Sequence, residues 1–452
     1  MGSNRRTRMY PPSAMLLAVL ASSILGGCAT YSDRILAASQ AAAGGDYSTA
    51  VTSLNQVLGV ESAASLPSEW KADRALAALE RGVLLQSLEQ YGDAARDISA
   101  AEGEIEIIDL SRDPVGTLGA YIYSDSAKAY AALPSERLAL NPFNLLNYLA
   151  QGDLNGAATE ARRFQVIRDF LDAEGIEDHG AAPYGAYLAG FVFEALGEGD
   201  RALRYYDTAL AGGALESLRR PAARLAAVNP YRGTNLEEFL AAPAAVGEVA
   251  GGGELLVVLH VGRVPHKVPE RLPVGVAVGL IGAELSRDLR WLSRGAGKVI
   301  VYPKLVDTPS RLGSPLLRVN GRPVELESLV DLSAVVRREY KDIEPKIIAA
   351  ALTRLAARAA VSEGVRQAGS QEGDVLGEVL GLLVEGLFVA FDRPDTRSWT
   401  MMPATVLVAR VQVAPGENVV EVDFAGVPAA SRRTTVAVSA GAYRAVVVTE
   451  PR

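Results

Sequence analysis

Few side chains in the sequence have the chemistry that metal binding needs. Its three histidines, His179, His260 and His266, belong to different predicted elements, and the one cysteine is Cys28. Zinc sites cluster Cys, His or carboxylate ligands, so the sequence predicts no metal. Asp178 and His179, beside two glutamates, form the one acidic cluster that contains a histidine, and a solvated helix end explains that cluster.

Two short motifs resemble catalytic or nucleotide-binding elements but are incomplete. Residues 68–71, Ser-Glu-Trp-Lys, match the Ser-x-x-Lys pattern of penicillin-binding enzymes, which also need Ser-x-Asn and Lys-Thr-Gly elements. Neither occurs in plausible form. Residues 295–298, Gly-Ala-Gly-Lys, are similar to a phosphate loop, but Leu292 replaces the first glycine and Val299 the Ser/Thr. We therefore expect neither nucleotide binding nor catalytic residues. Paired carboxylates for glycan cleavage can come from distant elements, so that possibility stays open.

Cys28 directly follows a segment typical of export signals. Arg5, Arg6 and Arg8 precede an apolar run at residues 14–25. This run is shorter than the roughly 20 residues of a membrane span and has the length of a signal peptide. A single cysteine cannot form an intramolecular disulfide. Cys28 is therefore either a modified residue or a free thiol.

Leu25, Gly26, Gly27 and Cys28 resemble the lipobox of bacterial lipoproteins. The resemblance implies cleavage between Gly27 and Cys28, a diacylglycerol on the Cys28 sulfur and an acyl chain, such as palmitate, on the new amino terminus. Two or three acyl chains hold a protein stably at a membrane. In Gram-negative lipoproteins aspartate at the second mature position typically retains the protein at the inner membrane. Ala29 therefore implies an outer-membrane lipoprotein facing the periplasm, if the host is Gram-negative.

The composition is that of a globular protein with an uneven charge distribution. The chain has 452 residues, of which 49% are hydrophobic and 22% charged, enough for two or three domains. Residues 29–250 hold 17 Lys plus Arg and 31 Asp plus Glu, a balance of −14, whereas residues 251–452 hold 25 and 22, a balance of +3. Neither half has the basic character of a nucleic-acid binder. We expect a signal peptide at 1–27, a helical domain at 28–240, a linker at 241–253, a mixed α/β domain at 254–400 and a β-rich segment at 401–452.

The helical domain resembles the tetratricopeptide repeat (TPR) superfamily. TPR hairpins place small residues where two helices cross. Four alanines that fit the crossing position are separated by 44, 63 and 45 residues rather than 34, so the array is irregular. An all-helical domain with accidental crossings of this kind is the alternative. The better two matches are Gly82, Leu85, Ala94 and Ile98, and Gly190, Phe193, Ala202 and Tyr206; the weaker two centre on Ala50 and Ala157.

After the linker, apolar residues alternate as they do in strands. The predicted strands lie at 254–262, 298–305 and 315–321, and four more fall in 401–452 as a small sandwich or meander. Helices are expected at about 328–366 and in the apolar run at 375–391. The predicted fold class is therefore α + β.

The combined pattern resembles bacterial lipoproteins that contain TPR repeats. Residues 141–163, 261–268 and 395–410 carry this likeness, which supplies architecture and location but no catalytic residues. The leading hypothesis is a lipid-anchored scaffold or adaptor of the cell envelope that binds a protein or peptide. The alternatives are a peptidoglycan enzyme or the activator of a cell-wall enzyme, and surface display for adhesion or export.

A basic stripe is predicted on a helix at residues 344–361. Pro345 suits a first helical turn, and Lys346, Arg354 and Arg358 then lie near one another on one face. We expect this stripe to make a weak electrostatic contact with the acidic helical half or with a partner. A solvated basic face is the alternative.

Replacing Cys28 by serine tests the lipid anchor. Serine cannot accept the diacylglycerol, so the Cys28→Ser protein should remain an uncleaved or mislocalised precursor. Cell fractionation with immunoblotting measures both properties. A Cys28→Ser protein that still fractionates with the outer membrane would contradict the prediction.

Overall fold

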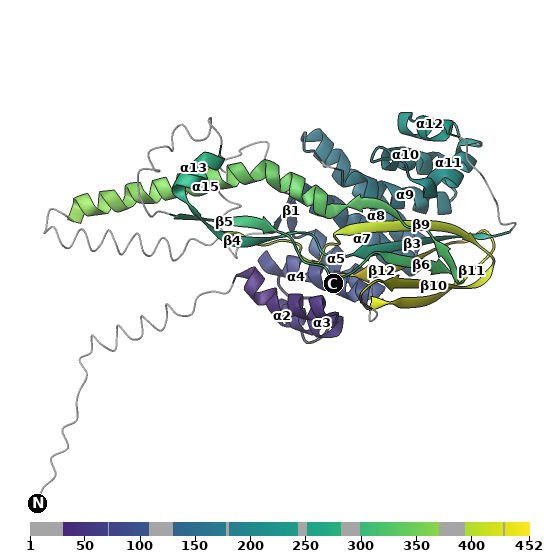
Figure 1. Cartoon of the computed structure of the whole chain (residues 1–452), viewed down its shortest axis with the longest axis horizontal. Coiled ribbons are helices and arrows are strands. Elements are labelled where there is room, and N and C mark those ends of the chain that lie inside the picture. Colours follow the sequence, from purple (N-terminus) through teal and green to yellow (C-terminus); the bar gives the residue numbers. More distant parts are fainter. Residues whose placement is uncertain are drawn as a thin grey trace, which may run out of the picture.

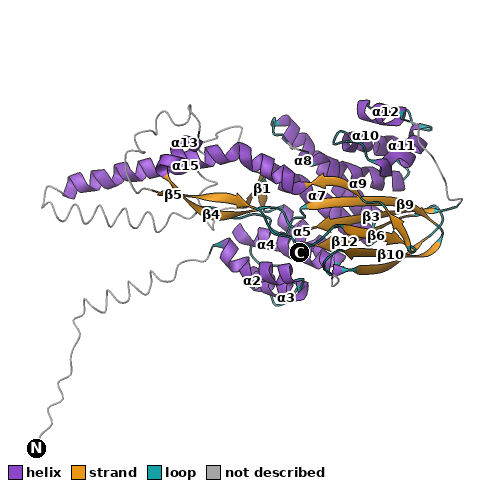
Figure 2. Cartoon of the chain, viewed as in Figure 1, coloured by secondary structure: helices purple, strands orange, loops and turns teal. Residues whose placement is uncertain are grey.

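The computed structural model describes residues 30–70, 72–107, 130–177, 180–242, 251–281, 299–369, 394–427 and 430–452. Helices fill the first half and strands dominate the second, which confirms the α + β class (Figures 1 and 2). The predicted signal peptide and lipobox, Asp178 and His179, the loop at 295–298 and the apolar run at 375–391 lie outside the described residues. Within the described ranges, no helix has the length and apolar character needed to cross a membrane.

Eight helices of the first half pair into four antiparallel hairpins. Glycines in the left-handed region end some helices, and aspartates begin others: Gly45 (φ 81°) ends the first helix, and Asp46 accepts a hydrogen bond from the Thr49 amide at 3.0 Å. The hairpins are α2 (Tyr31–Gly44) with α3 (Tyr47–Leu58), α4 (Ala72–Ser87) with α5 (Tyr91–Glu102), α7 (Pro134–Ala150) with α8 (Leu154–Ala173), and α9 (Ala182–Ala195) with α10 (Gly199–Leu210). A short 3-10 turn η1 (Glu216–Leu218), α11 (Arg219–Ala226) and α12 (Thr234–Ala241) complete the layer.

Small residues lie where the helices of a hairpin cross. A Cβ on Gly82 would come within 2.7 Å of Ile98 on the next helix, and a Cβ on Gly190 would overlap the ring of Tyr206. Ala94 and Ala202 are fully buried opposite them. The weaker matches, Ala50 and Ala157, are also fully buried and also lie on the second helix of a hairpin. Membership of the TPR superfamily stays a prediction.

The long interval between the second and third hairpins contains an insertion. Strands β1 (Ile105–Ile107) and β2 (Tyr130–Ala132) pair in parallel there. This insertion explains why Ala94 and Ala157 are 63 residues apart.

Among the residues that the structure describes, the strands of the second half form two four-stranded sheets and a two-stranded ribbon. One sheet has the order β12-β3-β9-β8, with β12 parallel to β3, and the other has the order β11-β10-β6-β7. The ribbon, α13 and α15 extend toward one end of the molecule (Figure 1). The bounds are β3 (Gly253–Val261), β4 (His266–Pro273), α13 (Val274–Leu280), β5 (Val299–Val306), β6 (Pro315–Val319), β7 (Arg322–Val324), β8 (Glu327–Asp331), α15 (Leu332–Gly369), β9 (Thr405–Val413), β10 (Gly416–Phe424), β11 (Arg432–Val438) and β12 (Tyr443–Glu450).

The predicted boundary between 254–400 and 401–452 is not a structural boundary. Strand β9 pairs with β3 on one side and with β8 on the other, and β10 pairs with β6. The last four strands are therefore interleaved with earlier ones in both sheets. Local alternation indicates a strand but not its neighbour, which is why the pattern predicted a separate sandwich.

Helix α15 matches the helical block predicted at about 328–366, but no helix begins at 344. The Asp331 carboxylate accepts a hydrogen bond from the Ala334 amide at 2.8 Å, and the helix runs from Leu332 with Pro345 inside it. The predicted start at 344 is therefore wrong. Proline at this place removes one backbone hydrogen bond, and the buried side chains of Ile343 and Ile347 on either side hold the helix in place.

The basic stripe on α15 is only partly described. Lys346 is exposed and Arg354 is half-buried, while the side chain of Arg358 lies outside the described residues. Helix α15 does contact the helical half, but through Glu339, which accepts hydrogen bonds from the amide of Ser135 at 2.8 Å and from its hydroxyl. The electrostatic contact of the stripe stays a prediction.

Enlarging a crossing residue should destabilise the helical layer. Ala94→Leu and Ala202→Leu each overpack a fully buried site and should lower the free energy of unfolding by about 1 to 3 kcal/mol. Ala43→Leu, at an exposed position of α2, is the matched control and should leave stability nearly unchanged. Thermal denaturation measures all three variants, and unchanged melting temperatures for both buried variants would show that the crossings are misplaced.

Candidate functional site

One face of the helical layer is occupied by the protein's own chain. Residues 394–403, Pro-Asp-Thr-Arg-Ser-Trp-Thr-Met-Met-Pro, are buried at every position and lie in no regular strand or helix apart from an isolated bridge at 394. A buried segment of this kind must find hydrogen-bond partners for its backbone outside a helix or sheet. The helical half supplies several of those partners.

Two buried glutamates of the helical half accept hydrogen bonds from this segment. Glu80 on α4 accepts from the Thr400 amide at 2.7 Å, from its hydroxyl at 2.8 Å and from the Met401 amide at 2.7 Å. Glu136 on α7 accepts from the Trp399 amide at 3.0 Å. Burial raises the pKa of Glu80 to about 7, although these hydrogen bonds act in the opposite direction.

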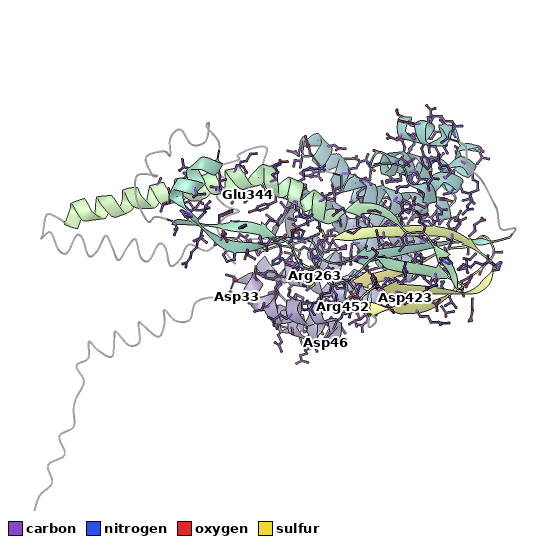
Figure 3. All side chains as sticks on the ribbon, in the orientation of Figure 1. Asp33, Asp46, Arg263, Glu344, Asp423 and Arg452 are labelled. Carbon is purple, nitrogen blue, oxygen red and sulfur yellow. The ribbon has the colours of Figure 1, made fainter. Side chains whose placement is uncertain are left out.

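Charged groups hold the segment on both sides of these glutamates. Arg397 pairs with Asp395 at 2.6 Å and with Asp73 of α4 at 3.6 Å. Arg263, which follows β3, donates to the Ser39 hydroxyl at 2.9 Å and lies in the middle of the molecule (Figure 3). Its positive charge favours the ionised form of Glu80 and so lowers the pKa of that carboxyl. The inner side of the helical layer is therefore filled by an internal segment.

His260, one of the candidate chemistry-bearing residues, is a neutral buried side chain. Its Nε2 lies 2.9 Å from the Tyr184 hydroxyl and its Nδ1 lies 3.0 Å from Oε1 of Gln86, and the ring stacks on Phe143 at 4.9 Å. Burial lowers the pKa of His260 to about 3. Both ring nitrogens have partners, so His260 joins the helices to β3.

The other predicted motifs are not brought together. His266 lies on β4, with Nδ1 2.9 Å from the Thr308 hydroxyl, and Ser68 is exposed in the loop before α4 while Lys71 lies outside the described residues. In the part of the chain that the structure describes, no three His, Cys, Asp or Glu side chains could hold a metal ion.

A buried ion network forms a second attachment between the two halves. Arg410 on β9 makes two hydrogen bonds to Glu194 on α9, at 2.7 and 2.9 Å, and one to Glu254 on β3 at 3.0 Å. The Tyr206 hydroxyl donates to Glu194 at 2.5 Å. These charges keep the pKa of Glu194 below its usual value despite its burial. The ionised pair is satisfied and fixes α9 against the sheet.

An open groove lies on the outer side of the helical layer. Its volume is about 590 Å³, within the range of ordinary binding sites. It is formed by α5, the start of α7 and one face of α8. The lining residues are Ser99, Glu102, Gly103, Arg137, Thr159, Arg162, Arg163, Val166 and Ile167.

Glu102 organises the charges of this groove. It accepts from Arg137 at 3.2 Å, from Arg163 at 3.0 Å and from the Asn141 amide at 2.8 Å. Arg163 also donates to the buried Glu160 at 3.1 Å. The floor of the groove is thus a prearranged set of hydrogen-bonded charges.

Apolar side chains continue the groove along α8. Val166 is 65% exposed and Phe170 is 44% exposed, one and two turns after Arg162. The Arg162 guanidinium lies 5.7 Å from the centre of the Phe193 ring, and it makes no ion pair with any described carboxylate. Guanidinium groups beside exposed apolar side chains suit the binding of another molecule. The sequence did not predict this groove, since α5 and α8 are brought together only by the fold; the apolar residues at 166 and 170 on an otherwise polar helix face were the one signal.

Comparison of the chain with models of protein families, with curated proteins and with solved structures found no match in any of the three. The groove and the filled inner face are therefore interpreted from their own geometry.

Replacing Glu80 by glutamine should change how stability depends on pH. The folded protein keeps the Glu80 proton up to about pH 7, whereas the unfolded chain loses it near its usual pKa of 4.5. Wild-type stability from this group is therefore fully present below that value and declines as the pH rises to 7, by up to about 3 kcal/mol.

The Glu80→Gln variant lacks this titration. It should be less stable than the wild type at pH 5, because one hydrogen bond to the segment is lost, and this deficit should shrink at pH 8. Urea unfolding at both values measures it, with Glu237→Gln at an exposed site of α12 as control. An equal deficit at both pH values would contradict the assignment.

Proposed function

We propose that this protein is a lipid-anchored scaffold or adaptor of the cell envelope. In this proposal the lipid on Cys28 holds it at the outer membrane, facing the periplasm of a Gram-negative host, and the helical half binds a protein or peptide. One observation carries the binding part of the proposal: the outer groove on α5, α7 and α8 is open and lined by the exposed side chain of Val166, and the exposed Phe170 follows one turn further along α8.

The inner face of the helical layer is filled by residues 394–403, which also favours the outer groove as the binding surface. Helical hairpin arrays often bind partners along their concave side, but here α4 and α7 contact β12 and hold residues 394–403. A partner would have to displace a fully buried segment to bind there. The outer groove needs no such displacement.

In this proposal the second half of the chain holds the helices in place. Buried contacts through His260 and Arg410 fix several helices against one sheet. A groove formed by three helices keeps its shape only if those helices do not move relative to one another. The proposal assigns binding to the helices and rigidity to the sheets, and it assigns no catalytic residue.

Site-specific crosslinking in cells tests the proposal. A photoreactive residue at position 166 should capture a discrete envelope protein, because Val166 borders the groove and is exposed. Position 228 is the matched control: Val228 is 81% exposed but does not line the groove. Gel electrophoresis and mass spectrometry identify the adducts.

A second change makes the crosslinking test specific. Phe170→Asp places a charge where the partner's apolar side chain would pack, and it should reduce the adduct at position 166 at least tenfold. If positions 166 and 228 capture the same proteins, or if Phe170→Asp has no effect, the groove is not the binding surface.

A further inference from the structure

We infer that the outer groove takes an extended protein segment in which a carboxylate side chain is followed by two apolar side chains along α8. This inference rests on the proposed function and specifies the chemistry of the partner. It is carried by the charges at the start of the groove, by the apolar residues that follow them, and by the polar side chains that line the groove.

The charges of the groove leave one guanidinium for a ligand. Arg137 and Arg163 both donate to Glu102, and Arg163 also donates to Glu160. Arg162 has an aromatic neighbour but no carboxylate partner within the described ranges. An incoming carboxylate can therefore pair with Arg162 and share Arg163, and a bidentate arginine is well suited to that geometry.

The surroundings make this preference selective. Residues 29–250 carry a balance of −14, so an acidic segment is repelled by much of the helical half. At the groove, three arginines face one lining glutamate. An acidic ligand is accordingly attracted to this place and disfavoured elsewhere.

The distances between Arg162, Val166 and Phe170 along α8 determine how far apart the matching side chains of the ligand must be. Val166 follows Arg162 by four residues and Phe170 follows Val166 by four, which is about 6 Å for each step along a helix axis. Every second side chain of an extended segment points the same way, at intervals of about 6.6 Å. An acidic residue with apolar residues two and four positions away therefore matches all three side chains.

The lining of the groove also suits an extended segment. An extended segment leaves backbone N–H and C=O groups free for hydrogen bonds, whereas a helix uses most of its own. Ser99 and Thr159 line the groove, and their hydroxyls can bind the main chain of such a segment.

Fluorescence anisotropy with defined peptides tests the inference. The protein is the full chain purified in detergent, and the probe is a labelled peptide with the core Glu-Ser-Leu-Ser-Phe between serines. The comparison peptide has lysine in place of glutamate. The glutamate peptide should bind at least tenfold more tightly than the lysine peptide, and the difference should shrink as salt rises from 50 to 500 mM.

Paired variants assign the effect to the groove. The double variant Arg162→Glu, Arg163→Glu should reverse the preference between the two peptides, because the guanidinium groups become carboxylates. The control, Arg318→Glu with Arg322→Glu, makes the same change of charge on β6 and β7 of the sandwich and should keep the wild-type preference. Thermal denaturation verifies that each variant is folded.

Three results would overturn the inference. The two peptides could bind the wild type equally, the sandwich control could lose the preference as well, or vesicles containing phosphatidylglycerol could bind through Arg162 and Arg163 while the peptides do not. The last result would assign the groove to lipid phosphate. Failure of the proposed function is distinguishable: a crosslinked partner at position 166 without any charge preference of the peptides rejects this inference alone.

Discussion

Burial of β3 on both faces is the constraint on which the rest of the structure depends. Leu255, Val257 and Leu259 point into the sandwich core, whereas Leu256 and Val258 pack with the helices. Such a strand has no solvent-facing side, so its sequence is continuously apolar. His260, the next residue toward the helices, must be neutral and fully hydrogen-bonded to lie there. The two halves of the chain therefore cannot separate without exposing the helix-facing side of this strand.

The acidic balance of the helical half is explained in part by hydrogen bonds and ion pairs inside the protein. Glu80 and Glu136 accept backbone amides of residues 399–401, and Glu194 takes the guanidinium of Arg410. Part of the acidic surplus of the helical half thus binds donors of the other half inside the protein. These donors come from β9 and from the segment before it; the contact predicted for the basic stripe of α15 stays a prediction. Buried pairs of this kind fix orientation more reliably than they add stability.

Local patterns in the sequence were sufficient to predict helices and strands but not the contacts that these elements make with one another. The apolar run at 254–262 and the small residues Gly82 and Gly190 depend on neighbours within one strand or one hairpin, so the sequence could predict them. The contact of Glu80 with Thr400 joins residues 320 positions apart, and no periodicity indicates it. The groove has the same origin, because Glu102 and Arg163 meet only after two hairpins have packed. A helix start was misplaced at 344 because proline by itself favours a first turn, whereas here packing of Ile343 and Ile347 keeps it in the interior of α15.

The contacts of residues 394–403 show which groups the inner face of the helical layer binds. Glu80 accepts hydrogen bonds from two consecutive backbone amides and from the Thr400 hydroxyl, so two of its three contacts with the segment are with the main chain. A glutamate buried for this purpose would be left with unsatisfied oxygens if the segment left, and a buried polar group without hydrogen bonds is costly. The inner face is therefore committed to its own chain in the folded protein. Any exchange of partners must use surfaces whose buried carboxylates need no ligand, and the outer face, where Glu102 pairs with Arg137 and Arg163, meets that condition.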